Sequence, residues 1–381
     1  MSTEIKPFRI EIPQADLDDL RERLAHTRWP KQLPGDGWDR GVPVDYLREL
    51  AEYWRNGFDW RAQEARFNEF PQFLTEIDGQ PIHFFHLRSS KPDALPLLLT
   101  HSWPNSIAEF TELLGPLSED FHVIAPSLPG FGFSPLAEPE WSLEKVAVTW
   151  AKLMSRLGYE RYGVHGNDAG ALVSPQIALV DAEHLVGVHI TGGLGITLEM
   201  MAEWGVGGSG YAEYLAARPQ TLAYGWHDSP VAQLAFLVER FKEFDGWHQA
   251  GSTEPIDRDL ILTNASVYWL TETGASSAWP YYTGGAGLPI DQALVPTGVS
   301  HGGPDEVRKL AEAKNDIVHW ASRDAGSHMI AMANPETILA DLRGFFGKLD
   351  ELRLVVEPAP VPGGRERGLD HRVVGEQAIS S

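Results

Sequence analysis

The segment YGVHGNDAGA, residues 162–171, places a carboxylate where chemistry can take place. An apolar stretch leads into Gly166 and Gly170, which flank Asp168 in the pattern G-x-D-x-G. In many hydrolases the same pattern carries a serine, on a sharp strand-to-helix turn that exposes its side chain. Aspartate is also a favoured residue at a helix N-terminus, so a purely structural role is the competing interpretation. Other parts of the chain decide between the two.

Three further segments place polar groups after predicted strands. HSWPNS, residues 101–106, follows a buried apolar strand, where α/β-hydrolases use a loop to donate one backbone N–H to an oxyanion hole. AGSHMIAMANPE contains His328 after the apparent last strand, and HGGPDEV contains Asp305 and Glu306 on an earlier loop. Nucleophile, acid and histidine therefore follow in the order of an α/β-hydrolase triad. Either acid is able to orient His328, although both also suit the first turn of a helix.

These residues predict a two-step hydrolysis with Asp168 as the nucleophile. An ionised carboxylate needs no activating base to attack a saturated carbon, and the product is an alkyl ester on the enzyme. His328 would then activate water against that ester, while an oxyanion hole stabilises the developing charge. An aspartate in place of serine therefore indicates that the electrophile is an sp³ carbon and not an acyl carbon.

The elements that must position these residues alternate between strand and helix from about residue 76 onward. This alternation predicts an α/β fold with a mostly parallel sheet and helices on both faces. Residues 195–285 interrupt it with a helical, aromatic-rich stretch, which predicts a cap inserted between strands. The predicted divisions are an N-terminal helical region over 1–75, a core of 76–194 and 286–350, the cap over 195–285, and a poorly ordered tail over 351–381.

The composition excludes several classes of partner and site. A net charge of −22 argues against nucleic acid and anionic membranes, because both bind basic surfaces. The chain has no cysteine, which rules out a disulfide framework, a thiolate nucleophile and a cysteine-bound metal. The N-terminus shows no secretory signal, and no stretch has the roughly 18 apolar residues of a membrane span, so a cytoplasmic protein is expected.

The chain resembles the microsomal-type epoxide hydrolases of the α/β-hydrolase superfamily, which carry an N-terminal meander. The resemblance covers about residues 5–348 and includes WDRGVPVDYLRELAEYW, APSLPGFGFS, YWLTETGASSAWPYY and GSHMIAMANPE. It implies an α/β-hydrolase core with a helical cap, and an enzyme that converts a small-molecule epoxide and water into a vicinal diol without a cofactor or metal. It also implies Asp168 as nucleophile and His328 as the base that activates water.

The resemblance assigns roles to four more residues. The backbone N–H groups of Trp103 and Ala169 would form the oxyanion hole. Tyr211 in GSGYAEYL and Tyr281 in SSAWPYY match the two tyrosines that bind the epoxide oxygen. A neutral phenol, with a pKa of about 10, is able to donate a proton to the alkoxide that forms on ring opening. Each tyrosine taken alone would also suit a core position in a helical cap.

Three segments depart from the family pattern. HSWP replaces HGWP, and GNDAG replaces GGDWG, so Ala169 stands where the family has tryptophan. The smaller side chain predicts a wider pocket and a bulky or aromatic epoxide. HGGPDEV replaces approximately VFPGEL; counting from the strand selects Asp305 as the triad acid, whereas the Pro-x-Glu pattern, which we follow, selects Glu306.

Two other functions stay open from the sequence alone. A haloalkane dehalogenase shares the aspartate and the histidine, but it uses the tryptophan that Ala169 replaces to bind halide. A non-catalytic binding protein on the same fold would explain the altered loops. The missing serine argues against an esterase. Some similar bacterial enzymes serve natural-product pathways, which makes a biosynthetic role an expectation, and a homodimer is left open.

Overall fold

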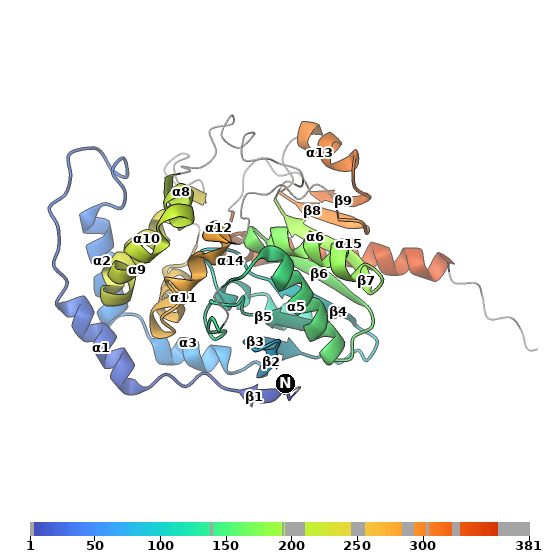
Figure 1. Cartoon of the computed structure of the whole chain (residues 1–381), viewed down its shortest axis with the longest axis horizontal. Helices are drawn as coiled ribbons and strands as arrows, with labels where there is room; N and C mark the ends of the chain where they lie inside the picture. Colours follow the sequence, from blue (N-terminus) through green and yellow to red (C-terminus); the bar gives the residue numbers. More distant parts are fainter. Residues whose placement is uncertain are drawn as a thin grey trace, which may run out of the picture.

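The computed structural model describes residues 4–137, 140–192, 194, 210–244, 256–283, 293–301, 305–321 and 328–356. At its centre is a nine-stranded sheet in the order β1-β2-β3-β5-β4-β6-β7-β8-β9 (Figure 1). The strands are β1 (Lys6–Phe8), β2 (Gln72–Ile77), β3 (Gln80–Leu87), β4 (Leu95–Thr100), β5 (Phe121–Pro126), β6 (Tyr162–Asn167), β7 (Leu185–Thr191), β8 (Thr297–Ser300) and β9 (Ile317–Ala321). From β5 to β9 all neighbours pair in parallel, whereas β1, β2 and β3 pair antiparallel at one edge.

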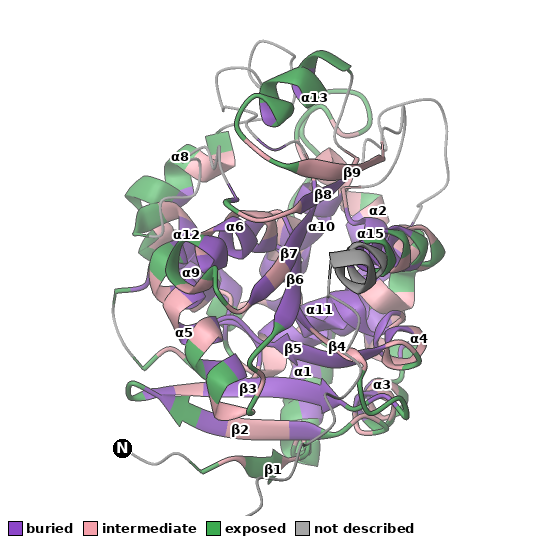
Figure 2. Cartoon of the chain, turned by 90° about the vertical axis from the view of Figure 1, so that its right-hand side faces the viewer, coloured by how far each residue is buried: buried purple, intermediate pink, exposed green. Residues whose placement is uncertain are grey.

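Helices cover both faces of this sheet. The helical elements are α1 (Gln14–Ala25), α2 (Val44–Asn56), α3 (Trp60–Phe67), η1 (Ile107–Phe110), α4 (Leu114–Ser118), α5 (Leu143–Arg156), α6 (Ala169–Asp181), α8 (Gly210–Ala217), α9 (Pro219–Asp228), α10 (Pro230–Phe244), α11 (Arg258–Leu270), η2 (Ser276–Ala278), α12 (Trp279–Tyr282), α13 (Asp305–Glu312), α14 (Ile330–Ala333) and α15 (Pro335–Val356). Figure 2 shows α5 and α6 on one side of the buried strands, and α4 and α15 on the other. The predicted α/β fold with a mostly parallel sheet is therefore confirmed.

The strands that carry site residues are apolar throughout because they are covered on both faces. In β5 every residue is buried, and in β4 the last four residues are. Continuous apolar runs of this kind are typical of central parallel strands. The carboxyl ends of β4 and β6, at Thr100 and Asn167, therefore lie at one edge of a rigid layer.

The N-terminal helices hold the cap from its outer side. In Figure 1, α1 and α2 flank α9 and α10, which belong to the interval between β7 and β8. Tyr53 donates a hydrogen bond to Asp259 over 2.8 Å, and the Trp54 indole donates to Ser266 over 2.9 Å. Two side chains of α2 therefore connect the N-terminal meander, residues 1–75, to α11 through hydrogen bonds.

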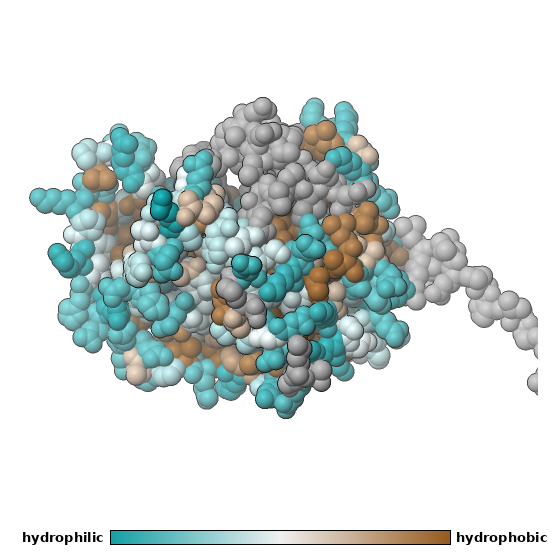
Figure 3. Space-filling model, viewed as in Figure 1, coloured by the Kyte–Doolittle hydropathy of each residue, from teal (hydrophilic) through white to brown (hydrophobic). Residues whose placement is uncertain are grey.

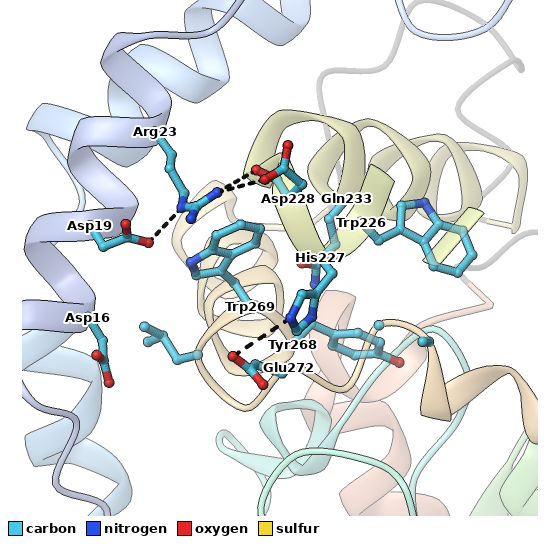
Figure 4. Close-up of a pocket in the computed structure, with 13 residues that line it drawn as sticks. Asp16, Asp19, Arg23, Trp226, His227, Asp228, Gln233, Tyr268, Trp269 and Glu272 are labelled. Carbon is cyan, nitrogen blue, oxygen red and sulfur yellow. Dashed lines mark hydrogen bonds and ion pairs between the residues drawn. The ribbon is translucent and has the colours of Figure 1, made fainter. Parts of the chain in front are cut away.

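A polar pocket of about 290 Å³ lies where α1 meets the cap (Figure 4). Arg23 reaches across it and pairs with Asp19 at 2.7 Å and with Asp228 of α9 at 3.2 Å. The guanidinium also stands 5.8 Å from the ring centre of Trp269. None of the residues predicted for catalysis lines this pocket, so we treat it as part of the contact between meander and cap.

The described surface is mostly polar, as the composition suggests. Apolar side chains come to the surface over α6 in Figure 3, where Leu179 is 51% and Val180 42% exposed. None of the helices in the described ranges combines the length and apolar character that a membrane span requires. The homodimer and the division into domains stay predictions; α15 continues to Val356, beyond the predicted core boundary, and the rest of the predicted tail lies outside the described residues.

Candidate active site

Asp168 sits in the turn between β6 and α6 with a strained backbone. Its φ of 52° and ψ of −113° lie outside the regions that non-glycine residues favour. The flanking glycines are required by close packing. A Cβ on Gly166 would lie 2.1 Å from the carbonyl oxygen of Gly170, and one on Gly170 would lie 2.0 Å from that of Thr100. The pattern G-x-D-x-G therefore follows from the tight approach of β6, α6 and β4.

One oxygen of Asp168 is held by two backbone donors. Oδ1 accepts the N–H of Trp103 over 3.0 Å and the N–H of Ala169 over 2.7 Å. An ordinary helix-capping aspartate accepts from the second or third helical residue instead. Two convergent N–H groups on one oxygen have the geometry of an oxyanion hole. The structure thus brings together three predicted site residues: Trp103, Asp168 and Ala169.

The second oxygen of Asp168 faces His328. Its Oδ2 lies 3.4 Å from Nε2 of His328, although the two residues are far apart in the chain. The backbone carbonyl of His328 accepts a hydrogen bond from the Asn167 amide over 2.8 Å. Both side chains are partly exposed, at 35% for His328 and 28% for Asp168. Part of each side chain is therefore open to solvent, whereas the Nε2 atom of His328 itself is buried.

The rings of the two predicted tyrosines lie close to each other and to Trp103 of the oxyanion loop, residues 101–106. The ring centroids of Tyr211 and Tyr281 are 5.8 Å apart, and they lie 5.6 Å and 4.8 Å from that of Trp103. Burial, together with the negative charge of Asp168, raises the pKa of Tyr211 to about 12. Burial and the neighbouring Tyr211 raise the pKa of Tyr281 well above its usual value. Both phenols therefore keep their protons at neutral pH.

Arg240, which the sequence analysis missed, supports Tyr211 from α10. Its guanidinium carbon stands 4.4 Å from the ring centre of Tyr211, a cation–π distance. The same group pairs with Glu239 at 2.7 Å and with Glu243 at 3.0 Å, and its side chain is only 5% exposed. This charge lowers the pKa of Tyr211 against the effect of burial. No local sequence pattern indicates that Arg240 and Tyr211 are in contact.

Asp305 and Glu306 are both exposed in the first turn of α13. Within the described ranges neither side chain makes a hydrogen bond or ion pair with His328. Acidic side chains in the first turn interact favourably with the helix dipole, so both residues also suit a purely structural role. The choice between the two therefore stays a prediction.

We expect substitution of the two acids to separate them. If one orients His328, Asp305→Asn and Glu306→Gln will differ sharply, and the severe one will lower kcat by on the order of 10²- to 10⁴-fold, as in other His–carboxylate pairs. The steady-state rate of diol formation measures this, with each variant as control for the other. Equally small losses would mean that another group orients the imidazole.

Glu109 is a second buried residue that the sequence analysis missed. It lies in η1, is 1% exposed, and accepts hydrogen bonds from Ser102 and Asn167, the residues that precede Trp103 and Asp168. The signal in the sequence is an acid inside the apolar run IAEF.

Known proteins resemble this chain over most of its length. The family described as "Epoxide hydrolase N terminus" matches residues 5–110, and "alpha/beta hydrolase fold" matches residues 95–228. A protein of Stigmatella aurantiaca named "Putative epoxide hydrolase" is 37% identical over 379 residues, which cover 91% of this chain and 85% of that protein. This chain belongs to the epoxide hydrolase family.

Other members of the epoxide hydrolase family show the same full-length likeness. "Epoxide hydrolase 1" of Sus scrofa is 29% identical, over 91% of this chain and 89% of its own. The crystal structure of juvenile hormone epoxide hydrolase from Bombyx mori matches with a TM-score of 0.78 at 29% identity, over 92% of this chain and 96% of that one. The Aspergillus niger epoxide hydrolase matches with a TM-score of 0.78 at 28% identity, over 91% and 97%. The predicted family and the α/β-hydrolase fold are confirmed.

Proposed function

We propose that this epoxide hydrolase works through a covalent ester on Asp168. The observation that supports the proposal is that the two carboxylate oxygens have different surroundings. Oδ1 is bound by the N–H groups of Trp103 and Ala169, so Oδ2 is the oxygen left to attack. Oδ1 stays in the same hydrogen bonds as a carboxylate oxygen, as an ester carbonyl and as the oxyanion of hydrolysis. Such preorganised donors stabilise charge without rearrangement.

In the first step, Oδ2 of Asp168 forms a bond to an epoxide carbon while the bond from that carbon to the epoxide oxygen breaks. Tyr211 or Tyr281 passes its phenol proton to the leaving alkoxide and becomes a tyrosinate. Two hydroxyls from different cap helices, α8 and α12, are able to bind one epoxide oxygen. Their raised pKa values ensure that the donors are protonated before the reaction.

In the second step, His328 removes a proton from water, and the water oxygen attacks the ester carbon of Asp168. The negative charge appears on Oδ1, between the two N–H groups. Collapse releases the diol alkoxide, which takes the proton from His328. The carboxyl group returns its own proton, through solvent, to the tyrosinate. Epoxide and water are consumed, and one diol is produced.

The proposed substrate class is a bulky or aromatic epoxide. Aromatic rings of Trp103, Tyr211, Tyr281 and Phe244 surround the approach to Asp168, and Phe244 lies 5.3 Å from the ring of His328. Ala169 places a methyl group beside the nucleophile, where the family pattern has tryptophan. The resemblance to bacterial enzymes of natural-product pathways is the basis for proposing a biosynthetic role.

Replacing Ala169 by tryptophan tests the substrate class. We expect Ala169→Trp to lower kcat/KM on bulky aromatic epoxides by on the order of tenfold or more, because a large ring would fill space beside Asp168. Small epoxides are the internal control and should lose much less. Equal losses on both classes would remove the argument for a wide pocket.

The function itself is tested with a panel of small and bulky epoxides and with halide release from haloalkanes. Turnover of epoxides by wild type and its loss in Asp168→Asn would support the proposal. Halide release without diol formation would support a dehalogenase. Ligand binding without turnover of any epoxide would support a binding protein.

A further inference from the structure

Glu109 lies at the junction of three segments that carry the proposed catalytic groups. Its Oε2 accepts the backbone N–H of Ser102 over 2.7 Å and the Ser102 hydroxyl over 2.8 Å. Its Oε1 accepts the amide of Asn167 over 3.3 Å. The same Asn167 amide nitrogen donates to the backbone carbonyl of His328 over 2.8 Å. One buried carboxylate thus links the oxyanion loop, the nucleophile strand and the histidine loop.

Both hydrogen-bond partners of Glu109 directly precede a residue of the site: Ser102 precedes Trp103, and Asn167 precedes Asp168. Fixing the N–H of Ser102 fixes the next N–H, that of Trp103, which binds Oδ1 of Asp168. Fixing Asn167 fixes the last residue of β6 before the turn. Misplacing reacting groups by about 1 Å can cost on the order of 10²-fold in rate.

We propose that Glu109 is a positioning residue for this reaction, and that it holds the oxyanion loop, Asp168 and His328 in register only as the ionised carboxylate. The inference rests on the ester mechanism proposed above. It makes the first chemical step sensitive to the charge of a side chain that never touches the substrate.

The hydrogen-bond inventory explains why the neutral acid cannot do the same. Three hydrogens point at the two oxygens of Glu109: two from Ser102 and one from Asn167. The Ser102 hydroxyl oxygen already accepts from Asn105 over 2.9 Å. Its hydrogen can reach Glu109 at 2.8 Å or the sulfur of Met329 at 3.7 Å, and the carboxylate is the much stronger acceptor. A proton on Oε1 would face the amide hydrogen of Asn167. Turning that amide over would satisfy Glu109 but would end the bond to the His328 carbonyl.

The ionisation of Glu109 falls in a useful range. Burial raises the pKa of Glu109 to about 7; the hydrogen bonds from Ser102 and Asn167 oppose this shift, and the charge of Asp168 adds to it. Because the pKa is raised, the carboxylate form dominates above about pH 7 and is lost below it. The proposed reaction should therefore be faster on the alkaline side.

Other titratable groups near Glu109 do not obscure this change. Burial lowers the pKa of His101, at the end of β4, to about 4, so it stays neutral from pH 6 to 8. Burial raises the pKa of Tyr268, on α11, far above that range. Ionised Asp168 and ionised Glu109 repel each other. Because alkylation removes the charge of Asp168, this repulsion also makes the first step faster when Glu109 is ionised. It therefore acts in the same direction as the positioning effect. His328 carries an imidazole, which is itself titratable, so the experiment replaces it with glutamine.

The experiment measures the first step alone in the His328→Gln variant, which is expected to stop at the ester. Quenched-flow samples analysed by intact mass give the rate of alkylation at each pH between about 5.5 and 9. With Glu109 present, we expect the rate to rise by on the order of ten- to a hundredfold as the pH passes through about 7. Adding Glu109→Gln should leave a slow rate that no longer depends on pH in this range.

The matched control is Glu112→Gln in the same background. Glu112 lies three residues further along, is 34% exposed and pairs with Arg66 at 2.6 Å, so its substitution should leave both the rate and the pH profile unchanged. An alkylation rate that is flat with pH while Glu109 is present would overturn the inference, even if Glu109→Gln failed to fold. Complete absence of adduct in His328→Gln would instead overturn the ester mechanism.

Discussion

Replacement of Asp168 by asparagine is expected to abolish diol formation, with a loss of at least about 10⁴-fold in kcat, as for other covalent nucleophiles. The amide keeps the shape of the side chain and still offers an oxygen to the N–H groups of Trp103 and Ala169. It lacks the charged oxygen that would attack the epoxide. Initial rates of diol release measure the effect, and an unchanged far-ultraviolet circular dichroism spectrum shows that the fold is retained.

The wild-type enzyme in heavy-oxygen water supplies the decisive companion measurement. Under single turnover the label should enter the carboxyl group of Asp168, and the released diol should be unlabelled, because water attacks the ester carbon and not the substrate. Mass spectrometry of the peptide that contains Asp168 detects the label. Label found directly in the diol would mean that water attacks the epoxide and that Asp168 acts as a base.

Replacement of His328 by glutamine is expected to let the first step proceed and to stall the second. Asp168 needs no base to attack, whereas hydrolysis of the ester needs water activated by the imidazole that lies 3.4 Å from Oδ2. Turnover should fall by about 10²- to 10⁴-fold, the usual contribution of a general base. The enzyme should accumulate an adduct whose mass increase equals the mass of the substrate.

The double variant Asp168→Asn with His328→Gln is the control for that adduct. It should remain unmodified under identical conditions, since the attacking oxygen is gone. An adduct of the same mass in the double variant would place the ester on a different side chain.

Local sequence signals selected Asp168 and His328 as candidates, and the structure places the two side chains 3.4 Å apart. The glycines around Asp168 are imposed by contacts within a few residues and with the neighbouring β4, so the turn leaves a short and recognisable pattern. His328 was found from its place after the last strand. The alternation of strands and helices gave the parallel sheet, but it contained no information on β4 lying between β5 and β6.

The rest of the site depends on packing between distant segments. Glu109 and its partner Asn167 are 58 residues apart, and a single acid among Ile107, Ala108 and Phe110 has no periodicity to reveal its burial. Arg240 reaches Tyr211 from another cap helix. The sequence leaves two candidates for the triad acid, because Asp305 and Glu306 both suit the first turn of a helix and both follow a predicted strand.

The attachment of the meander to the cap has a consequence for the order of events on the ribosome. Tyr53 and Trp54 bond to residues that lie 206 and 212 positions later in the chain. At about 5–20 residues per second, these partners are synthesised roughly 10–40 s after α2. During that interval the apolar face of α2 lacks the cap that will cover it, and nascent-chain chaperones have time to bind there. The segment that is made first is therefore among the last to reach its final environment.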